Sequence, residues 1–546
     1  MKRCMSAFIL ILWGSLAWAQ VVHDPNDGIY KDLDRWAVRG YVHSLPPIRP
    51  YPVQMLDELL SQVAEAGDGP AQEKARAYMA AIGAGARPIH VGALGLVRGE
   101  NQSLSLEGAP TFDGSLRFED WMTASYALAV YGATRGPGNE ILVPGLYSPY
   151  PDFVEDQAEI GPFKILQNWT STLALGSSSL YFQAGMNRTS FGPFFDSSLV
   201  IGAQVGRAGH FSVNYRKDTW SIGVLLLEIS ASDDFGRNRF PNKHLILHTF
   251  DIRPFPNLEL GVFESVVWGG RFEFLYMAPF NQYFAAQSLT GFEDNSLVGV
   301  HGRWTAAKDL QVLGQVYVDD LHFNDMVRLK LDTKYKFAAE LGLRWSPEQG
   351  PLADLRADYT AIMPYMYSHI TDPREGPNSA RYIPNKPNFY NYSHMGRSLG
   401  SDLKPNSDRL SFGSDWRILP SLELGLSAYM TRHGNASEGV WGINKYTWHD
   451  GSYLDDGYSD PPVSQSDTIT PYGPQMTFER MTNFLNQRVI ETKAAAGFDL
   501  DWSYPTPLGT ITAQAGYTLE YGWNRNLSDG NNGIVHFWNV GGGWRW

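Results

Sequence analysis

Several segments of the chain alternate apolar and polar residues with a period of two. Residues 334–345 (KYKFAAELGLRW) place their aromatic and aliphatic side chains on one face and Lys336, Glu340 and Arg344 on the other. The same alternation occurs in residues 179–187, 421–430 and 510–521. Segments of roughly 9–12 residues match tilted membrane-crossing strands, whereas soluble strands usually have about 5–6 residues. The pattern therefore predicts a transmembrane β-barrel. Composition alone does not distinguish such a barrel from a soluble β-sandwich or propeller.

Apolar runs after residue 19 are short. The aliphatic core at residues 224–227 has only four residues, whereas a membrane-spanning helix needs about 20. If this part of the chain spans a bilayer, it must do so with closed strands, because lipid cannot satisfy open backbone groups. A barrel wall is apolar only at every second position, so its average hydropathy hides its membrane face.

Turn signals separate the alternating segments. They are Asn242-Lys243, Pro256-Asn257, Lys308-Asp309 and Pro420-Ser421, and each predicts a hairpin. We count roughly sixteen to eighteen candidate antiparallel strands after residue 90, the size of a porin barrel. The last segment alternates up to Trp546, and a final strand ending in an aromatic residue resembles the signal read by the barrel assembly machinery. No repeat of about 20–50 residues indicates a propeller.

The first 19 residues have the features of an export signal. Lys2 and Arg3 precede an apolar run at residues 8–13, and Ala17 and Ala19 fit a cleavage site before Gln20. We expect residues 1–19 to be a signal peptide, with a retained anchor as the alternative. The only cysteine, Cys4, lies in this segment, so the mature chain is expected to contain no disulfide.

Residues 20–86 have helical rather than strand periodicity. Helices are predicted at residues 27–39, 53–66 and 70–81, with Asp27 as an N-cap and Gly40 as a stop. We expect a periplasmic helical segment at the mouth of a barrel that spans residues 87–546. There it could plug the pore or contact a periplasmic partner; a separate periplasmic tether is the alternative.

Charge and motifs exclude several functions. Removal of Lys2 and Arg3 from 44 basic residues leaves 42 against 57 acidic residues, a charge of −15. This balance argues against nucleic acid as a partner. Residues 396–400 (GRSLG) fit G-x-S-x-G, but they lie in an irregular stretch and not at the strand-to-helix turn that this motif needs, and no H-E-x-x-H or paired-carboxylate context occurs. We therefore expect neither an enzyme nor a bound cofactor or metal.

Two long irregular stretches, near residues 372–408 and 432–480, are expected to be extracellular loops, because periplasmic turns of such barrels are short. The second contains several aspartates that could bind Ca²⁺. Their spacing does not match a regular twelve-residue calcium loop, so a solvated acidic loop is the favoured interpretation.

Three motifs resemble the capsule assembly protein Wzi family. They are residues 391–400 (NYSHMGRSLG) with 405–409, residues 429–434 (YMTRHG) and residues 483–489 (NFLNQRV). Shorter matches occur at Gly192-Pro193 and Asn295-Ser296. The resemblance covers nearly the whole mature chain. It implies a bacterial outer-membrane barrel of about 18 strands with periplasmic helices, and a non-catalytic surface lectin that holds capsular or exopolysaccharide on the cell.

The resemblance and the composition of the loops suggest ligand-binding residues. Aromatic rings can stack on sugar faces, and arginine can grip uronate carboxylates through paired hydrogen bonds. The candidates are Tyr392, His394, Arg397, Asp402, Asn406, Arg409, Arg432 and His433. Packing of the loop over the barrel mouth is the alternative role. We expect Tyr392→Ala with Arg397→Ala to preserve folding and to reduce glycan retention. A channel for small solutes is the alternative function, based on the polar lumen residues Arg303, Lys336 and Arg344.

Overall fold

The computed structural model describes most of the chain. The described residues are 24–25, 27–82, 89–134, 154–194, 197–202, 205–230, 242–278, 281–290, 294–321, 327–328, 335–364, 366–367, 389–394, 397–435 and 484–546. The predicted signal peptide at residues 1–19 and large parts of the predicted loops lie outside these residues.

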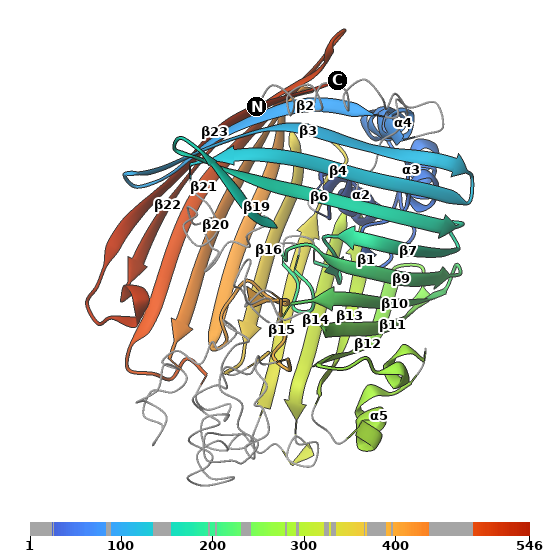
Figure 1. The fold of residues 1–546 in the computed structure, drawn as a ribbon, viewed down its shortest axis with the longest axis vertical. Helices are drawn as coiled ribbons and strands as arrows, with labels where there is room; N and C mark the ends of the chain where they lie inside the picture. Colours follow the sequence, from blue (N-terminus) through green and yellow to red (C-terminus); the bar gives the residue numbers. More distant parts are fainter. Residues whose placement is uncertain are drawn as a thin grey trace.

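Antiparallel strands form a closed barrel (Figure 1). Its ring has 18 strands: β2 (His90–Glu100), β3 (Ser103–Glu119), β4 (Met122–Ala133), β6 (Phe163–Gly176), β7 (Leu180–Asn187), β9 (Ala208–Arg216), β10 (Trp220–Ile229), β11 (Lys243–Phe255), β12 (Leu258–Gly269), β13 (Asn295–Ala307), β14 (Leu310–Leu321), β15 (Tyr335–Trp345), β16 (Leu352–Ile362), β19 (Ser407–Leu419), β20 (Leu422–Gly434), β21 (Ile490–Thr506), β22 (Gly509–Trp523) and β23 (Gly533–Arg545). A further strand, β5 (Val154–Ile160), pairs with the first part of β6. Pairing of β2 with β23 closes the ring.

The predicted alternation separates the outside of the barrel from its lumen. In β15, Leu341, Leu343 and Trp345 are exposed on the outer face, whereas Lys336 and Glu340 are buried on the inner face. An exposed apolar outer face is what the hydrocarbon of a bilayer requires, and a polar inner face suits a lumen. The fold is therefore that of an outer-membrane β-barrel, and the predicted fold class is confirmed.

The two ends of the barrel differ in the length of their connections. Predicted turns at Pro256-Asn257, Lys308-Asp309 and Pro420-Ser421 join adjacent strands tightly at one end. The Asn242-Lys243 prediction is wrong, because β10 ends at Ile229 and β11 begins at Lys243, so these residues end a longer connection. By the usual asymmetry of such barrels, we expect the short-turn end to be the periplasmic one.

The three predicted N-terminal helices are present as α2 (Gly28–Val38), α3 (Val53–Ala66) and α4 (Gly69–Ile82). The Asp27 side chain caps α2 by accepting a hydrogen bond from the backbone N–H of Ile29. Their apolar faces share one buried core, to which Tyr181 of the barrel wall also belongs. Among the described residues, no helix has the length and apolar character needed to cross a membrane.

A second core lies inside the barrel. The short strand β1 (Ile48–Arg49) pairs with β8 (Ser190–Phe191) from the connection between β7 and β9. The chain that follows the first helix therefore meets an inward-folded loop within the lumen. This core joins Ile48 and Phe191 to wall residues of β10–β16 and to loop residues that include Tyr367, Tyr392 and Leu399.

Small elements complete the loops at the other end: β17 (Ser393–His394), β18 (Arg397–Ser398), η1 (Phe274–Met277), α5 (Tyr283–Thr290) and η4 (Arg525–Leu527). Both predicted loop boundaries need correction. Asp408 belongs to β19, and Arg432 and His433 belong to β20, because Ser407 and Asp408 pair with His433 and Arg432 across the two strands. The loop expected near residues 432–480 therefore begins after Gly434.

Candidate functional site

The predicted ligand residue Tyr392 is fully buried inside the barrel. Its hydroxyl donates a hydrogen bond to the backbone carbonyl of Val200 over 2.8 Å, and its ring stacks on Tyr367 at 5.6 Å. Burial raises the pKa of the Tyr392 phenol, so this group is neutral. These contacts join the loop that contains Tyr392 to the inward-folded connection between β7 and β9, which contains Val200. The expectation that Tyr392→Ala preserves folding therefore conflicts with the geometry.

His394 lies beside Tyr392 in the same loop and is also buried. Its Nδ1 accepts a hydrogen bond from the backbone N–H of Ser230 at 2.9 Å, and its Nε2 lies 2.9 Å from the carbonyl of Arg207. A ring that accepts at Nδ1 must donate at Nε2, which fixes a neutral tautomer. His394 thus joins three segments of the chain at the loop end of the barrel.

Asp402 and Arg409 form a paired contact between this loop and the wall. Both terminal nitrogens of Arg409, on β19, bond to the Asp402 carboxylate at 2.6 and 2.9 Å. The backbone of Asn406 has a positive φ of 60°. Its side-chain Oδ1 accepts a hydrogen bond from the backbone N–H of Leu485 at 2.9 Å. The Asn406 amide also donates to the carbonyl of Gly434. Asn406 therefore ties the chain before β19 to the end of β20 and to the chain before β21.

Arg432 differs from the other candidates in its exposure. Its side chain is 48% exposed and forms an ion pair with Asp408 of the adjacent strand. His433, the next residue, is buried with Nδ1 2.9 Å from the Ser407 hydroxyl. The side chain of Arg397 lies outside the described residues. Of the eight candidates, Arg432 is thus the one whose described side chain is both charged and substantially exposed. It points outward from the end of β20, on the face that carries Leu426 and Met430.

A second polar cluster, which sequence reasoning missed, joins the helical segment to the barrel lumen. Arg35 of α2 bonds through Nε to Asp354 of β16 at 2.6 Å and through Nη2 to Asp415 of β19 at 2.8 Å. Asp32, one turn earlier, bonds to Lys74 of α4 at 2.8 Å. The i, i+3 spacing of Asp32 and Arg35 is visible in the sequence, but Asp354 and Asp415, the wall partners of Arg35, lie more than 300 residues away.

The pKa values in this cluster follow from burial and charge. Burial raises the pKa of Asp32, but the Lys74 ammonium and the Arg35 guanidinium outweigh it and hold this pKa below its ordinary value. Burial lowers the pKa of Arg35, and the carboxylates of Asp354, Asp32 and Asp415 reverse the shift and raise it. Both groups are therefore charged across the physiological range. The cluster is an ionic anchor between the helices and the wall.

Further contacts carry the helical segment across the bore. Asp57 of α3 pairs with Arg117 of β3, and Glu58 lies 3.3 Å from Arg216 of β9. On the other side, the guanidinium of Arg39 donates to the carbonyls of Ser346 and Pro347, in the turn between β15 and β16. Contacts on opposite walls attach this segment to the barrel across its short-turn end, so it is not a separate tether; we call it the plug.

Part of the lumen wall is not covered by the plug. The inward side chains of Asp499 and Asp501 on β21 and of Gln514 on β22 are exposed. They lie in the half of each strand nearer the short turn. In the described part of the chain, no group of three or more His, Cys, Asp or Glu side chains is arranged to hold a metal ion.

Comparisons with known proteins agree with this fold. No family model matches the sequence, and no curated protein matches it significantly. A solved structure of Wzi from Escherichia coli, described as an outer-membrane carbohydrate-binding β-barrel involved in group 1 capsule assembly, aligns with 96% of this chain and 99% of its own, at 13% identity and a TM-score of 0.54. The OccAB2 structure from Acinetobacter baumannii aligns with 84% of this chain and 97% of its own, at 10% identity and a TM-score of 0.44. The chain thus shares the barrel architecture of the Wzi structure.

Proposed function

We propose that the protein is a non-catalytic, Wzi-like outer-membrane barrel that holds capsular or exopolysaccharide at the cell surface. The observation that carries this proposal is the plug. Helices enter the lumen from the short-turn end, and loops enter from the other end and meet them at the pairing of β1 with β8. In a barrel filled in this way, the surface is more accessible to a ligand than the bore.

The likeness to Wzi supports the same proposal at the level of fold. The buried candidates, Tyr392, His394, Asp402, Asn406, Arg409 and His433, would support the extracellular surface by fixing the loops. Arg432 is the candidate for direct contact, because its guanidinium is half exposed and can bond a uronate carboxylate. Arg397 stays a predicted ligand residue.

Deletion of the gene in its native host tests the function. We expect surface polysaccharide to move from the cell-bound fraction into the medium, and wild-type complementation to restore the cell-bound fraction. Polysaccharide in the two fractions is measured by uronic-acid or total-sugar assay. An identical partition with and without the protein would remove the polysaccharide-holding role.

Arg432→Gln tests the contact residue. We expect this variant to insert normally and to retain several-fold less polysaccharide, because a neutral amide cannot form the paired charged contact. Arg488→Gln is the matched control, since Arg488 is also an exposed arginine, with a side chain 75% accessible and 3.6 Å from Asp529. Equal retention by the two variants would place the glycan contact elsewhere.

A channel for small solutes is a second candidate function. It is favoured by the exposed inward side chains of Asp499, Asp501 and Gln514, which leave a polar, acidic strip of lumen wall beside the plug. An acidic strip of this kind would select cations. Conductance across a planar bilayer separates this function from the polysaccharide-holding one.

Two further partners follow from the proposal. Outer-membrane lipid would cover the apolar outer face, which includes Leu341 and Leu343. The barrel assembly machinery would recognise β23, whose outward Trp538, Val540 and Trp544 precede the terminal Trp546. Removal of Trp546 is expected to slow insertion, as measured by the fraction of protein in the outer-membrane pellet.

A further inference from the structure

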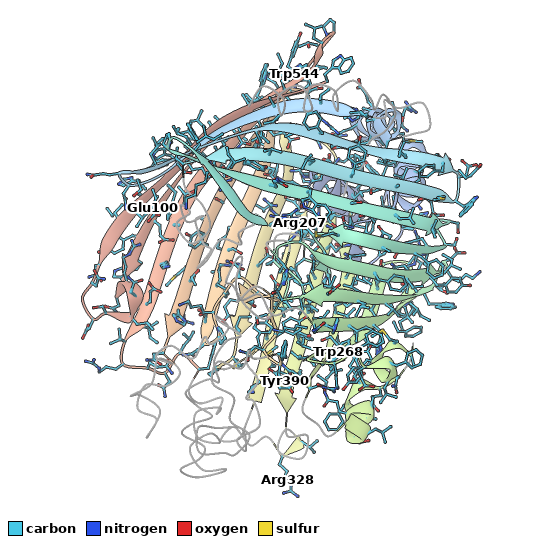
Figure 2. The ribbon with its side chains drawn as sticks, viewed as in Figure 1. Glu100, Arg207, Trp268, Arg328, Tyr390 and Trp544 are labelled. Atoms are coloured by element: carbon cyan, nitrogen blue, oxygen red, sulfur yellow. The ribbon has the colours of Figure 1, made fainter. Side chains whose placement is uncertain are left out.

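The connection between β12 and β13 folds back against the outside of the barrel. The ring centroids of Tyr283 on α5 and His248 on β11 lie 4.4 Å apart. Those of Tyr276 in η1 and Trp268 on β12 lie 5.1 Å apart. Figure 1 shows α5 next to β12, at the end of the barrel away from α3 and α4, and Figure 2 marks Trp268 in this region. We name residues 270–278 and 281–290 the outer shelf.

The wall residues beneath the outer shelf point away from the lumen. Ile246 alternates with Leu245 and Leu247, which belong to the lumen core, so its side chain must point outward. Nevertheless Ile246 is only 1% exposed, because it packs in a cluster with Tyr276 and Tyr283 of the outer shelf. The shelf therefore occupies a part of the outer wall that would otherwise be open.

The apolar surface of the outer wall is interrupted by one polar cross-strand pair. His248 and Glu264 face each other on β11 and β12, with 3.5 Å between Nε2 and Oε2. Toward the short-turn end, outward residues such as Phe250 and Val262 are exposed and apolar, as lipid contact requires. Glu264 also accepts the backbone N–H of Phe284 at 3.0 Å. The polar pair thus marks the upper edge of the apolar band, directly where the shelf begins.

The outward surface of the shelf is itself apolar. Phe272, Phe274, Phe284 and Leu289 are 64%, 78%, 62% and 79% exposed. Two polar groups of the shelf bond to Asp294, the residue before β13: the Tyr276 hydroxyl donates to its carboxylate at 2.6 Å, and the Gln287 amide donates to its backbone carbonyl at 2.8 Å. An amphipathic element with large apolar residues at the edge of a lipid-facing wall has the properties of an interfacial membrane anchor.

We propose that the outer shelf inserts these four apolar side chains among the acyl chains of the outer leaflet. The occupant is lipid because the apolar surface of the shelf continues the lipid-facing wall across the His248–Glu264 pair. The shelf's two charged groups, Arg271 and Glu273, lie 3.4 Å apart, and Arg271 also pairs with Asp294 at 2.5 Å. This pairing lowers the cost of a position near hydrocarbon. Insertion on one side anchors the barrel at the level of β11 and β12.

Spin labels at single cysteines test the proposal. With Cys4→Ser as the background, Phe284→Cys and Leu289→Cys are labelled and reconstituted in vesicles of phosphatidylethanolamine and phosphatidylglycerol. Val262→Cys is the control within the membrane, and Asp529→Cys, whose native side chain is 71% accessible, is the control in water. Collision rates with oxygen and with a water-soluble nickel chelate are measured by electron paramagnetic resonance.

We expect labels at positions 284 and 289 to favour oxygen over the chelate several-fold, as the label at 262 does. Labels that instead match position 529 would show that the shelf lies in water and would overturn the proposal. Spin–spin broadening at position 284 would show contact with a second copy and would overturn it as well. Heat-dependent mobility in gels establishes that each variant has folded, and Phe272→Cys provides a second probe outside α5.

Discussion

Arg35 joins α2 to two barrel strands through buried ion pairs with Asp354 and Asp415. A buried charge that loses its partner is strongly unfavourable, because neither water nor another charge compensates for its lost hydration. The sequence offers a direct comparison. Lys31, one turn earlier on α2, pairs with Asp415 at 2.9 Å but has a side chain that is 33% exposed.

Arg35→Met is expected to weaken docking of the helices by about 3–5 kcal/mol, because it leaves two buried carboxylates without this partner. Lys31→Met should cost at most about 1 kcal/mol, since its pair is partly solvated. Docking is measured by urea titration of the distance between spin labels at Arg76 of α4 and Leu508 of the β21–β22 turn. Equal effects of the two substitutions would contradict the role of Arg35 as the ionic anchor.

Tyr392 gives a second test at the level of single residues. Tyr392→Phe removes the hydrogen bond to the Val200 carbonyl and should cost about 1–3 kcal/mol. Tyr392→Ala also opens a cavity in the lumen core and should cost about 3–5 kcal/mol. Unfolding in detergent micelles measures both values. A loss below about 1 kcal/mol for Tyr392→Ala would instead support the expectation of an exposed ligand-binding side chain.

At the level of elements, the helical segment should respond to acid. The pKa of Asp32 is lower in the folded protein than its ordinary value of 3.8. Its contribution to docking is therefore complete above pH 3.8 and is lost as the pH falls from 3.8 through the lowered pKa. The distribution of distances between the labels at positions 76 and 508 should be narrow at about pH 7 and broader at about pH 3.

Asp32→Asn is the control for this pH effect, because Asp354 and Asp415 also surround Arg35 and can titrate. The variant should dock more weakly at about pH 7 and show a smaller change on acidification. An acid response identical to that of the native protein would assign the effect to carboxylates other than Asp32.

Local sequence patterns predict where helices and strands lie better than they predict which of them are in contact. The periodicity of residues 53–66 gave the bounds of α3, and the alternation of residues 334–345 gave β15, because both patterns record which face is buried. The loop boundary near residue 432 was wrong, since Arg432 and His433 are polar but pair in β20 with residues of β19. The outer shelf could not be predicted, because Phe284 and Leu289 look like ordinary buried residues in sequence.

The candidate site illustrates the same difference. Asp402 and Arg409 are both predicted ligand residues, but they bond to each other and fix the loop. Nothing in their spacing distinguishes a ligand contact from a structural pair. Arg35, by contrast, was overlooked because its partners at Asp354 and Asp415 are brought near only by closure of the barrel.

At the level of the whole molecule, two inward-folded parts of the chain meet in the lumen. The N-terminal helices fill the short-turn end, and the loops that contain Phe191 and Tyr392 pack against the wall of β10–β16. The inward faces of β21 and β22 are the least covered part of the described wall. The central claim is that this filled barrel works through its surface and does not act as a steady pore.

Single-channel recording of the purified protein in planar bilayers tests this claim most directly. The account predicts no steady conductance for the native protein, together with brief openings for Arg35→Met, in which the helices are more weakly docked. Long-lived openings of uniform conductance in the native protein, selective for cations, would contradict the account and would favour a channel along Asp499 and Asp501.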